Sequence, residues 1–249
     1  MIQEAPEKKD PLPPQSPPAL ELRSVSYNSL KPNSLNLDDF SSTVEPKQLV
    51  EVYLDQQQNP HEFIELVVGL RTPTQGTIRA CGVDWLTSQY ESIFKIRSRI
   101  GRVFGGPAWI QNLTVGENIR LAPLHQRIRA KIIQQKLEYW IERLSGQYAA
   151  EVKRSLRSRP AFVQEHILQI SQLIRAMIND PLVLLLERPF KGIPKEIRKD
   201  LTTAIVQQCQ SGTAVLWFTD RPLVDLQSTV EYRSWKISNN NMLVNGGVA

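Results

Sequence analysis

The chain has 249 residues, of which 41% are hydrophobic and 22% are charged, and its formal net charge is +5. This composition is typical of a globular protein with a substantial core. No apolar run approaches the roughly 18–20 residues of a membrane-spanning helix, and the N-terminus has no signal-peptide pattern, which excludes an integral membrane protein. Two cysteines far apart predict free thiols in a reducing compartment, and the three histidines show no zinc-type spacing.

The hydrophobic pattern predicts alternating strands and helices after a tail. Residues 1–18 contain six prolines and mixed charge, which predicts disorder. Strands are expected at 19–27, 36–44, 49–53, 77–81, 99–104, 182–186 and 214–218. Helices are expected at 62–70, 128–144, 164–179 and 197–210, and a closing hairpin at 232–237 and 242–244. Buried aliphatic strands alternating with helices predict an α/β fold with a mainly parallel sheet, made mixed by antiparallel N-terminal strands.

The loop at 54–62 reads Leu-Asp-Gln-Gln-Gln-Asn-Pro-His-Glu and lies between an expected strand and an expected helix. In a nucleotide-binding α/β protein, a glycine-rich phosphate loop ending in Gly-Lys-Ser or Gly-Lys-Thr would occupy this place. The loop has neither glycine nor lysine, and it has a proline at the lysine position. We therefore expect that this loop does not bind phosphate in the usual way.

The positive charge is concentrated at 120–160, where ten Lys or Arg residues stand against three acidic residues. One interpretation is a solvated face of an amphipathic helix. The other is a surface for anionic lipid head groups or an acidic partner. Nucleic acid is not expected, because no aromatic-rich binding motif accompanies the charge.

Several stretches carry a family resemblance, and they occur in family order and spacing: 68–78, 100–104, 113–119 and 175–189. On these stretches the chain resembles the ATP-binding cassette family, the ATPase subunits of ABC transporters, from residue 19 to about 246. Within the family, the run 90–101 resembles the ATPases of MCE/Mla-type lipid transporters. The resemblance implies an ABC-type P-loop NTPase fold over 19–249, with a helical subdomain at about 106–180 inserted in it.

The resemblance also implies which residues occupy the nucleotide site. Tyr27 stands where the family stacks an aromatic ring on adenine. Asn59 replaces a glycine of the phosphate loop, and Pro60, which has no N–H, replaces its lysine. His61 replaces the magnesium-binding hydroxyl, and Glu62 adds negative charge where an anion would bind.

The other implied site positions are changed as well. Gly105 replaces the glutamine that contacts metal and water, and Glu187 replaces the magnesium-linked aspartate. Arg188 replaces the glutamate general base, Pro194 an aspartate of the dimer-contact loop, and Asp220 the switch histidine. We expect the buried Arg188 to pair with a carboxylate of this site, because an unpaired buried charge is costly.

The family signature aligns with a segment that has lost both of its glycines, namely Val163, Gln164, Glu165, His166 and Ile167. Taken together, these changes predict a degenerate pseudo-ATPase with no catalytic residue, no metal site, and neither ATP nor magnesium as cofactor. The named positions would then be only the remnant of a nucleotide site and a signature.

The expected function is a catalytically inactive subunit with a structural or regulatory role, docked on the permease of an ABC transporter, of the MCE/Mla lipid type if the narrower resemblance holds. The expected docking residues are Gly105, Gly106, Pro107, Trp109 and Ile110. The chain would be cytoplasmic, peripheral on the inner face of the membrane, and paired as a homodimer or with another ABC ATPase, with its basic segment toward anionic lipid. The alternatives are a free-standing soluble regulator or scaffold, and an ATP-binding subunit that uses unorthodox residues.

Overall fold

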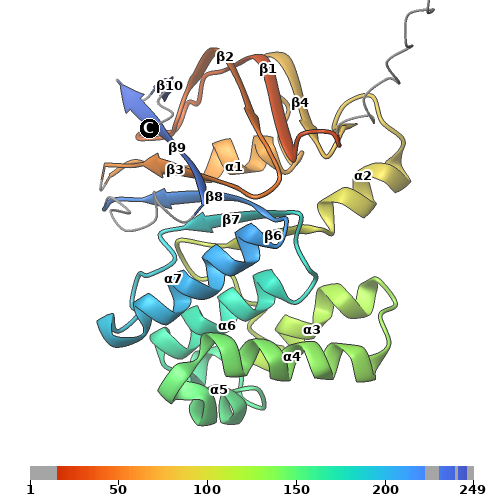
Figure 1. Cartoon of the computed structure of the whole chain (residues 1–249), viewed down its shortest axis with the longest axis vertical. Coiled ribbons are helices and arrows are strands. Elements are labelled where there is room, and N and C mark those ends of the chain that lie inside the picture. The colour runs from red at the N-terminus through yellow and green to blue at the C-terminus, as the bar shows by residue number, and fades with distance from the viewer. Residues whose placement is uncertain (1–15, 56, 222–229, 239–240, 246–249) are drawn as a thin grey trace, which may run out of the picture.

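The computed structural model describes residues 16–55, 57–221, 230–238 and 241–245, which form three layers (Figure 1). An antiparallel sheet lies above helix α1, a larger and mainly parallel sheet lies below it, and the remaining helices other than α2 cover the far face of the larger sheet. The strands are β1 Leu20–Tyr27, β2 Leu37–Val44, β3 Gln48–Tyr53, β4 Gln75–Ala80, β5 Val83–Asp84, β6 Ile100–Val103, β7 Val183–Glu187, β8 Ala214–Thr219, β9 Glu231–Ser238 and β10 Asn241–Asn245. The helices are α1 His61–Val67, α2 Tyr90–Arg97, α3 Val115–His125, α4 Ala130–Leu144, α5 Ala149–Ser155, α6 Glu165–Met177 and α7 Lys195–Gln210.

The larger sheet has the strand order β10-β9-β3-β8-β7-β6. Strands β9, β3, β8, β7 and β6 run parallel to their neighbours, and β10 closes the sheet as an antiparallel hairpin with β9. All five residues of β7 are buried. Val183 and Leu185 pack on the α1 side, whereas Leu184 and Leu186 pack on the side of α6 and α7, as the two-residue strand period requires. The expected strand buried on both faces is therefore confirmed.

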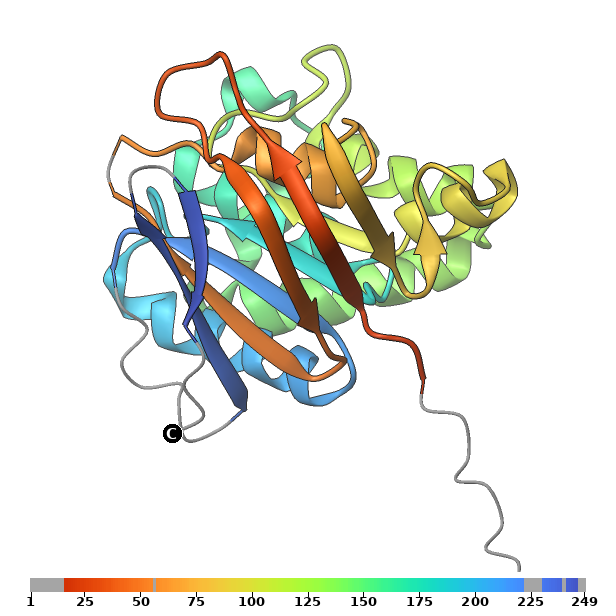
Figure 2. The same ribbon diagram turned by 90° about the horizontal axis from the view of Figure 1, so that it is seen from above.

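The antiparallel strands form a sheet of their own, in the order β2-β1-β4-β5. Figure 2 shows β1, β2 and β4 side by side above the rest of the chain. The predicted fold class is confirmed, with one difference in detail: these strands do not extend the parallel sheet. The separation has a packing cause, because α1 fills the space between the two sheets and buries Phe63, Ile64 and Leu66 completely.

Helices α3 to α6 lie between β6 and β7 in the sequence and pack on the α6 side of the larger sheet (Figure 1). Helix α3 begins with a capping box in which Thr114 and Glu117 satisfy each other's backbone N–H groups. The pattern did not single out α2 and α3 as separate helices. The boundaries proposed for the helical subdomain remain a prediction, and most of the expected N-terminal tail and part of the hairpin turn lie outside the described residues.

Two further observations concern membrane-spanning helices and disulfide bonds. Within the part of the chain that the structure describes, no helix is long and apolar enough to cross a bilayer. Cys81 and Cys209 are both free thiols.

Replacing Phe63 by alanine should destabilise the protein strongly. Its fully buried ring lies 5.9 Å from the ring of Phe218 and 6.3 Å from that of Trp235, so truncation would leave a cavity between the sheets. We expect a loss of about 3–5 kcal/mol in the free energy of unfolding, measured by urea denaturation. The matched control is Phe162→Ala, whose side chain is 83% exposed and should change stability by less than about 0.5 kcal/mol. Equal effects of the two variants would contradict this packing.

Candidate functional site

The chain passes from β3 into α1 through a turn that is anchored at both ends. Leu54 is fully buried, and its N–H donates to the carbonyl oxygen of Thr219 at 2.8 Å, which fastens the loop to the end of β8. Pro60 directly precedes α1, where its missing N–H costs no helical hydrogen bond. The proline therefore suits the start of a helix, although it brings no charge to the loop.

Four N–H groups in and next to this loop donate to protein acceptors. The N–H of Asp55 donates to Gln58 Oε1 at 2.9 Å, and the N–H of Gln58 donates to the Asp55 carbonyl oxygen at 3.1 Å. The N–H of Asn59 donates to the Asn33 carbonyl oxygen at 2.8 Å, and Asn59 Oδ1 accepts from the N–H of His61 at 3.0 Å. An anion that used these N–H groups would have to displace protein acceptors.

Arg188 holds the same loop from the opposite side. It follows β7 with a left-handed φ of 41°, which marks the sharp turn out of the strand. Its guanidinium donates to the carbonyl oxygens of Asp55 at 2.9 Å and Gln58 at 3.0 Å. The sequence-based expectation was a carboxylate partner for Arg188; these two contacts go to backbone oxygens.

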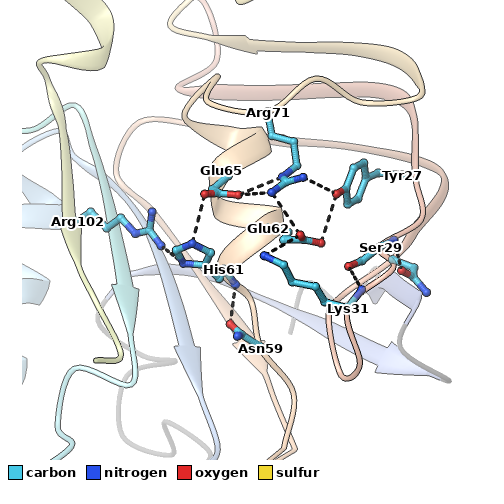
Figure 3. Close-up of polar contacts among 10 residues, drawn as sticks. Tyr27, Ser29, Lys31, Asn59, His61, Glu62, Glu65, Arg71 and Arg102 are labelled. Carbon is cyan, nitrogen blue, oxygen red and sulfur yellow. Dashed lines mark hydrogen bonds and ion pairs between the residues drawn. The ribbon is translucent and has the colours of Figure 1, made fainter. Parts of the chain in front are cut away.

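Arg102 supplies the cation for the nearby carboxylate. Its Nε donates to Glu187 Oε1 at 2.7 Å, and its terminal nitrogen lies 3.0 Å from His61 Nδ1. Both side chains of the Arg102–Glu187 pair are about one-tenth exposed or less, so the pair is largely withdrawn from water. Figure 3 shows Arg102 reaching His61 at the first turn of α1. Breaking one partner of such a pair leaves an uncompensated buried charge.

A second charged cluster lies on the other side of α1, around Glu62 (Figure 3). Lys31 and Arg71 each approach Glu62 Oε1 at 3.3 Å, and Arg71 also donates to Glu65 at 2.8 Å. The hydroxyl of Tyr27 donates to Glu62 at 3.3 Å and accepts from Arg71 at 3.0 Å. Two cations thus meet two carboxylates beside the aromatic ring that the resemblance assigns to adenine.

Two pKa shifts follow from this cluster. Burial and the negative charge of Glu62 raise the pKa of Tyr27 above its usual value. For Glu62, burial alone would raise the pKa, but hydrogen bonds from Ser29 and Lys31 and the charge of Arg71 outweigh it, so the pKa is lowered. Glu62 is therefore ionised at neutral pH.

The structure brings the expected nucleotide-site positions to one edge of the larger sheet. Tyr27, Asn59, His61 and Glu62 surround the first turn of α1 (Figure 3). A Cβ placed on Gly105 would lie 3.6 Å from Glu187 Cβ, so Gly105 lies against the end of β7. Asp220 and Arg188 line a common cavity next to the loop. Convergence at the carboxyl ends of parallel strands is the usual position of a ligand site in α/β proteins.

The signature-like segment lies at the start of α6. Ile167 is buried in the core, and the His166 ring packs 5.0 Å from the ring of Tyr148. Gln164 and Glu165 are exposed, and a Cβ on Gly192 would approach Glu165 Cδ to 3.3 Å. Within one chain, the segment therefore contacts the loop that follows β7.

The expected docking loop is packed against Arg175 and is only partly accessible. Trp109 is 9% exposed, and the Arg175 guanidinium lies 4.6 Å above its ring, so Trp109 packs into the core. Arg175 donates to the Ala108 carbonyl oxygen at 2.6 Å, and burial lowers its pKa to about 10. Gly106, Pro107 and Ile110 are exposed, so these are the members of the expected docking set that a partner can reach.

The fit of a magnesium ion depends on Glu187. Among the described residues, no group of three or more His, Cys, Asp and Glu side chains is arranged to hold a metal. Magnesium commonly takes only one or two protein carboxylates, together with phosphate oxygens and water. Glu187, at the end of β7, suits that use, although an ion there would compete with the guanidinium of Arg102.

Sequence reasoning missed the cations of this site: Lys31, Arg71 and Arg102. Lys31 and Arg102 are far in sequence from their partners Glu62 and Glu187, so no local motif identifies them. Arg71 is different, because it follows α1 closely and lies six residues after its partner Glu65. A search for charges flanking the altered loop could have identified Arg71.

Known proteins similar to this chain are ATP-binding subunits of transporters, although no family model matches it. The sulfate/thiosulfate import ATP-binding protein CysA of Mesostigma viride is 32% identical over 56% of this chain and 37% of its own length. CysA of Pseudomonas aeruginosa is 27% identical over 74% and 53%, and the thiamine import ATP-binding protein ThiQ of Escherichia coli K12 is 24% identical over 75% of each chain. The chain thus spans about a third to a half of the length of these CysA relatives.

Two solved structures share the fold. The ATP-binding subunit of an ABC transporter superposes with a TM-score of 0.74 at 18% identity, covering 91% of this chain and 90% of its own. The ATP-binding cassette MJ0796, a dimer in a post-hydrolysis state bound to ADP and Pi, gives 0.73 at 16% identity, covering 92% and 100%.

These comparisons correct two sequence-based expectations. The chain was expected to be a degenerate pseudo-ATPase and to take neither ATP nor magnesium, whereas its relatives are named ATP-binding proteins, and nothing in the comparisons indicates degeneracy. The expectation rested on the joint replacement of the motif residues. It did not allow for cations from elsewhere in the chain, such as Lys31 and Arg71, reaching the same turn of α1.

The lowered pKa of Glu62 predicts how its contribution to stability depends on pH. Because the folded-state pKa lies below the usual 4.5, the carboxylate stabilises the fold fully above about pH 4.5, and this contribution is lost as the pH falls through the folded pKa. The difference in unfolding free energy between wild type and Glu62→Gln, measured by urea denaturation from pH 3 to 7, should therefore shrink on acidification. The exposed Glu142→Gln is the control. A Glu62→Gln difference that is constant across this range would contradict the electrostatic network.

The fold and the sequence relatives indicate the same kind of protein. The fold is that of ABC ATPases over nearly the whole chain. The sequence relatives are the ATP-binding subunits of import transporters. The chain is therefore similar in fold and in sequence to ATP-binding subunits of ABC transporters.

Proposed function

We propose that the chain is the ATP-binding subunit of an ABC transporter, working on the inner face of a membrane with a permease. We infer that ATP binds at the first turn of α1 through cations that do not belong to the usual phosphate-loop motif. The observation that carries this proposal is the cluster of Lys31, Arg71 and Tyr27 beside the loop. The ATP-binding relatives and the cassette fold support it.

The cations of this cluster are accessible to a ligand. The Lys31 side chain is 64% exposed and that of Arg71 is 33% exposed, whereas the side chain of Glu62, which they share, is 5% exposed. A phosphate oxygen can approach one cation while the other stays paired with Glu62, so that buried carboxylate keeps a partner. Tyr27 offers an aromatic face beside the same cations. The triphosphate would then be bound by side-chain charge rather than by the N–H groups of the loop.

Magnesium, when bound with ATP, would neutralise phosphate charge. Glu187 is the residue placed to hold it, and Arg102 orients that carboxylate through the ion pair. Because Arg102 also contacts His61, loss of the pair would disturb the first turn of α1. Arg102 is therefore a positioning residue for Glu187 in this proposal.

ATP binding should depend on the two cations beside Glu62. In a calorimetric titration of the full chain with and without magnesium, Lys31→Ala and Arg71→Ala should each weaken ATP binding about tenfold, as expected for one lost charge-assisted hydrogen bond. Lys131→Ala, an exposed lysine of α4, is the matched control and should leave the affinity unchanged. Inorganic phosphate released in the same samples measures hydrolysis. The proposal fails if wild type shows no saturable ATP binding, or if the control loses as much affinity.

The permease would dock on exposed apolar side chains of α2, α3 and the loop that follows β6. Tyr90 is 72% exposed, Leu124 52% and Ile110 44%. Phe94 stacks with Tyr90 and lies 5.3 Å from the ring of His125, which joins α2 to α3 into one surface. Large exposed apolar side chains gathered in this way are typical of a protein interface.

Substitution on this surface should release the permease. We expect the tagged chain to co-purify from detergent-solubilised membranes with a multi-span protein encoded beside it. Ile110→Asp and Leu124→Asp should each reduce the recovered partner several-fold, since a buried carboxylate in an apolar interface is unfavourable. Phe162→Asp, at an exposed apolar position, is the control. Recovery of the chain without a membrane protein would instead favour the free-standing regulator or scaffold.

Lipid transport is a second, narrower candidate. The run 90–101, which resembles the ATPases of MCE/Mla-type transporters, forms α2 and the start of β6. The basic segment at 120–160 extends over α3, α4 and α5, where anionic lipid could approach it. The named relatives serve sulfate, thiosulfate and thiamine import. An MCE-type protein encoded beside this chain would favour lipid over those solutes.

A further inference from the structure

A cavity of about 670 Å³ lies between α3, α4 and the end of α5. Figure 1 shows these three helices at the end of the molecule opposite the antiparallel sheet. None of the described residues that line it belongs to the nucleotide edge or to the docking surface proposed above. Its volume lies within the range of small-molecule sites.

Two walls of this cavity carry opposite charge. Helix α4 presents Glu138 and Glu142, which are one helical turn apart, and the other wall presents Lys153 of α5 and Arg157 just after it. Like charges one turn apart on a helix repel each other weakly, so neither pair is favoured by its own helix. In the part of the chain that the structure describes, no ion pair joins these cations to these carboxylates. The cavity therefore keeps opposite charges apart.

A third cation of the cavity is satisfied by a chain of hydrogen bonds. Arg120 of α3 donates to Gln134 Oε1 at 3.1 Å, and Gln134 Nε2 donates to Glu138 Oε1 at 2.7 Å. Glu142, Lys153 and Arg157 are exposed, and no side-chain partner for them lies among the described residues. These three side chains are two cations and one carboxylate, so they favour a ligand with both signs of charge and an excess of one negative charge.

The frame of the cavity is ordered by backbone contacts between α3 and the segment after α5. The N–H of Val115 donates to the Ser158 carbonyl oxygen at 2.9 Å, and that of Gly116 donates to the Leu156 carbonyl oxygen at 3.0 Å. A Cβ on Gly116 would lie 2.6 Å from a terminal nitrogen of Arg120, so the missing side chain gives that guanidinium its place. A wall that is already ordered loses less conformational entropy on binding.

We propose that this cavity binds a zwitterion that carries a phosphate and a primary ammonium group. The phosphate would lie between Lys153 and Arg157, and the ammonium group, with three N–H donors, would lie at Glu142. Ile141, which is 1% exposed, and Leu156 would contact the methylene groups between the two charges. The inference goes beyond the proposed function, since its residues take no part in ATP binding or permease docking.

Calorimetric titration of the full chain with phosphoethanolamine, ethyl phosphate and ethanolamine tests this proposal. Phosphoethanolamine should bind saturably and about tenfold more tightly than either of the other two, because it alone supplies both charges. The inference is overturned if phosphoethanolamine does not saturate, or if ethyl phosphate or ethanolamine binds equally well.

Variants assign the two charges to their walls. Lys153→Ala combined with Arg157→Ala should weaken phosphoethanolamine and ethyl phosphate at least tenfold, whereas Glu142→Gln should weaken phosphoethanolamine about tenfold and leave ethyl phosphate unchanged. Lys131→Ala, an exposed lysine elsewhere on α4, is the matched control. If Glu142→Gln weakens both ligands equally, or neither, the ammonium group does not bind there and the inference is wrong.

Two comparisons separate this inference from the proposed function and identify the source of the ligand. Lys31→Ala should weaken ATP and leave phosphoethanolamine unchanged, and phosphoethanolamine binding without ATP binding would remove only the proposed function. The same chemistry occurs in a lipid head group, so co-sedimentation should compare phosphatidylcholine vesicles with vesicles that also contain phosphatidylethanolamine. Capture by the mixed vesicles alone, lost in Glu142→Gln, supports the inference with a lipid source. Binding of phosphoethanolamine without capture supports it with a free small molecule.

Discussion

The position of the loop at 54–62 depends on the packing of α1 between the two sheets. Phe63 lies against Phe218 of the larger sheet and Trp235 of β9, and Trp235 in turn packs 5.4 Å from Phe40 of β2. These edge-to-face contacts join α1 to the larger sheet, and the contact of Trp235 with Phe40 joins that sheet to the antiparallel one. Because the helix is only seven residues long, its first turn is fixed together with its buried face. The loop before it has consequently little freedom, whatever its sequence.

Charge around that first turn is balanced in separate pairs. Glu62 meets Lys31 and Arg71, Glu187 meets Arg102, and the carbonyl oxygens of the loop meet Arg188. The pairs differ in the exposure of their cations. Arg102 is largely buried together with Glu187, whereas Lys31 is mostly in water although its partner Glu62 is buried. Removing Arg102, or both cations of Glu62, would leave a buried carboxylate uncompensated. Lys31 is therefore more accessible to a ligand than Arg102.

Much of the fold could be predicted from local pattern. The hydrophobic runs at 182–186 and 214–218 predict buried strands, and the structure has a buried strand at each of them. Helix α2 was missed because it is short and buries none of its residues, so it has no apolar stripe to detect. Helix α3 carries a strong start signal in Thr114 and Glu117, but Pro123 near its end weakens the helical pattern.

The site was harder to predict because its chemistry depends on contacts between distant residues. The altered loop was identified from sequence, and its position at the carboxyl end of β3 is as expected. The charge around the loop could not be predicted from the motif, because Lys31, Arg71 and Arg102 reach the loop only through the tertiary fold. A missing lysine removes a charge from one backbone position. Cations from other parts of the chain can still surround that position, and a ligand responds to the electrostatic potential that they create.

Arg188 links the end of β7 to the altered loop. As a replacement for a carboxylate it first suggested only a loss, yet its guanidinium donates to two carbonyl oxygens of the loop and lines the neighbouring cavity. A carboxylate at this position could not make those contacts, since carbonyl oxygens only accept hydrogen bonds. The arginine therefore stabilises a loop in which the N–H groups of Asp55, Gln58 and Asn59 already donate to protein acceptors. An anion bound beside Arg188 would act on the same two hydrogen bonds.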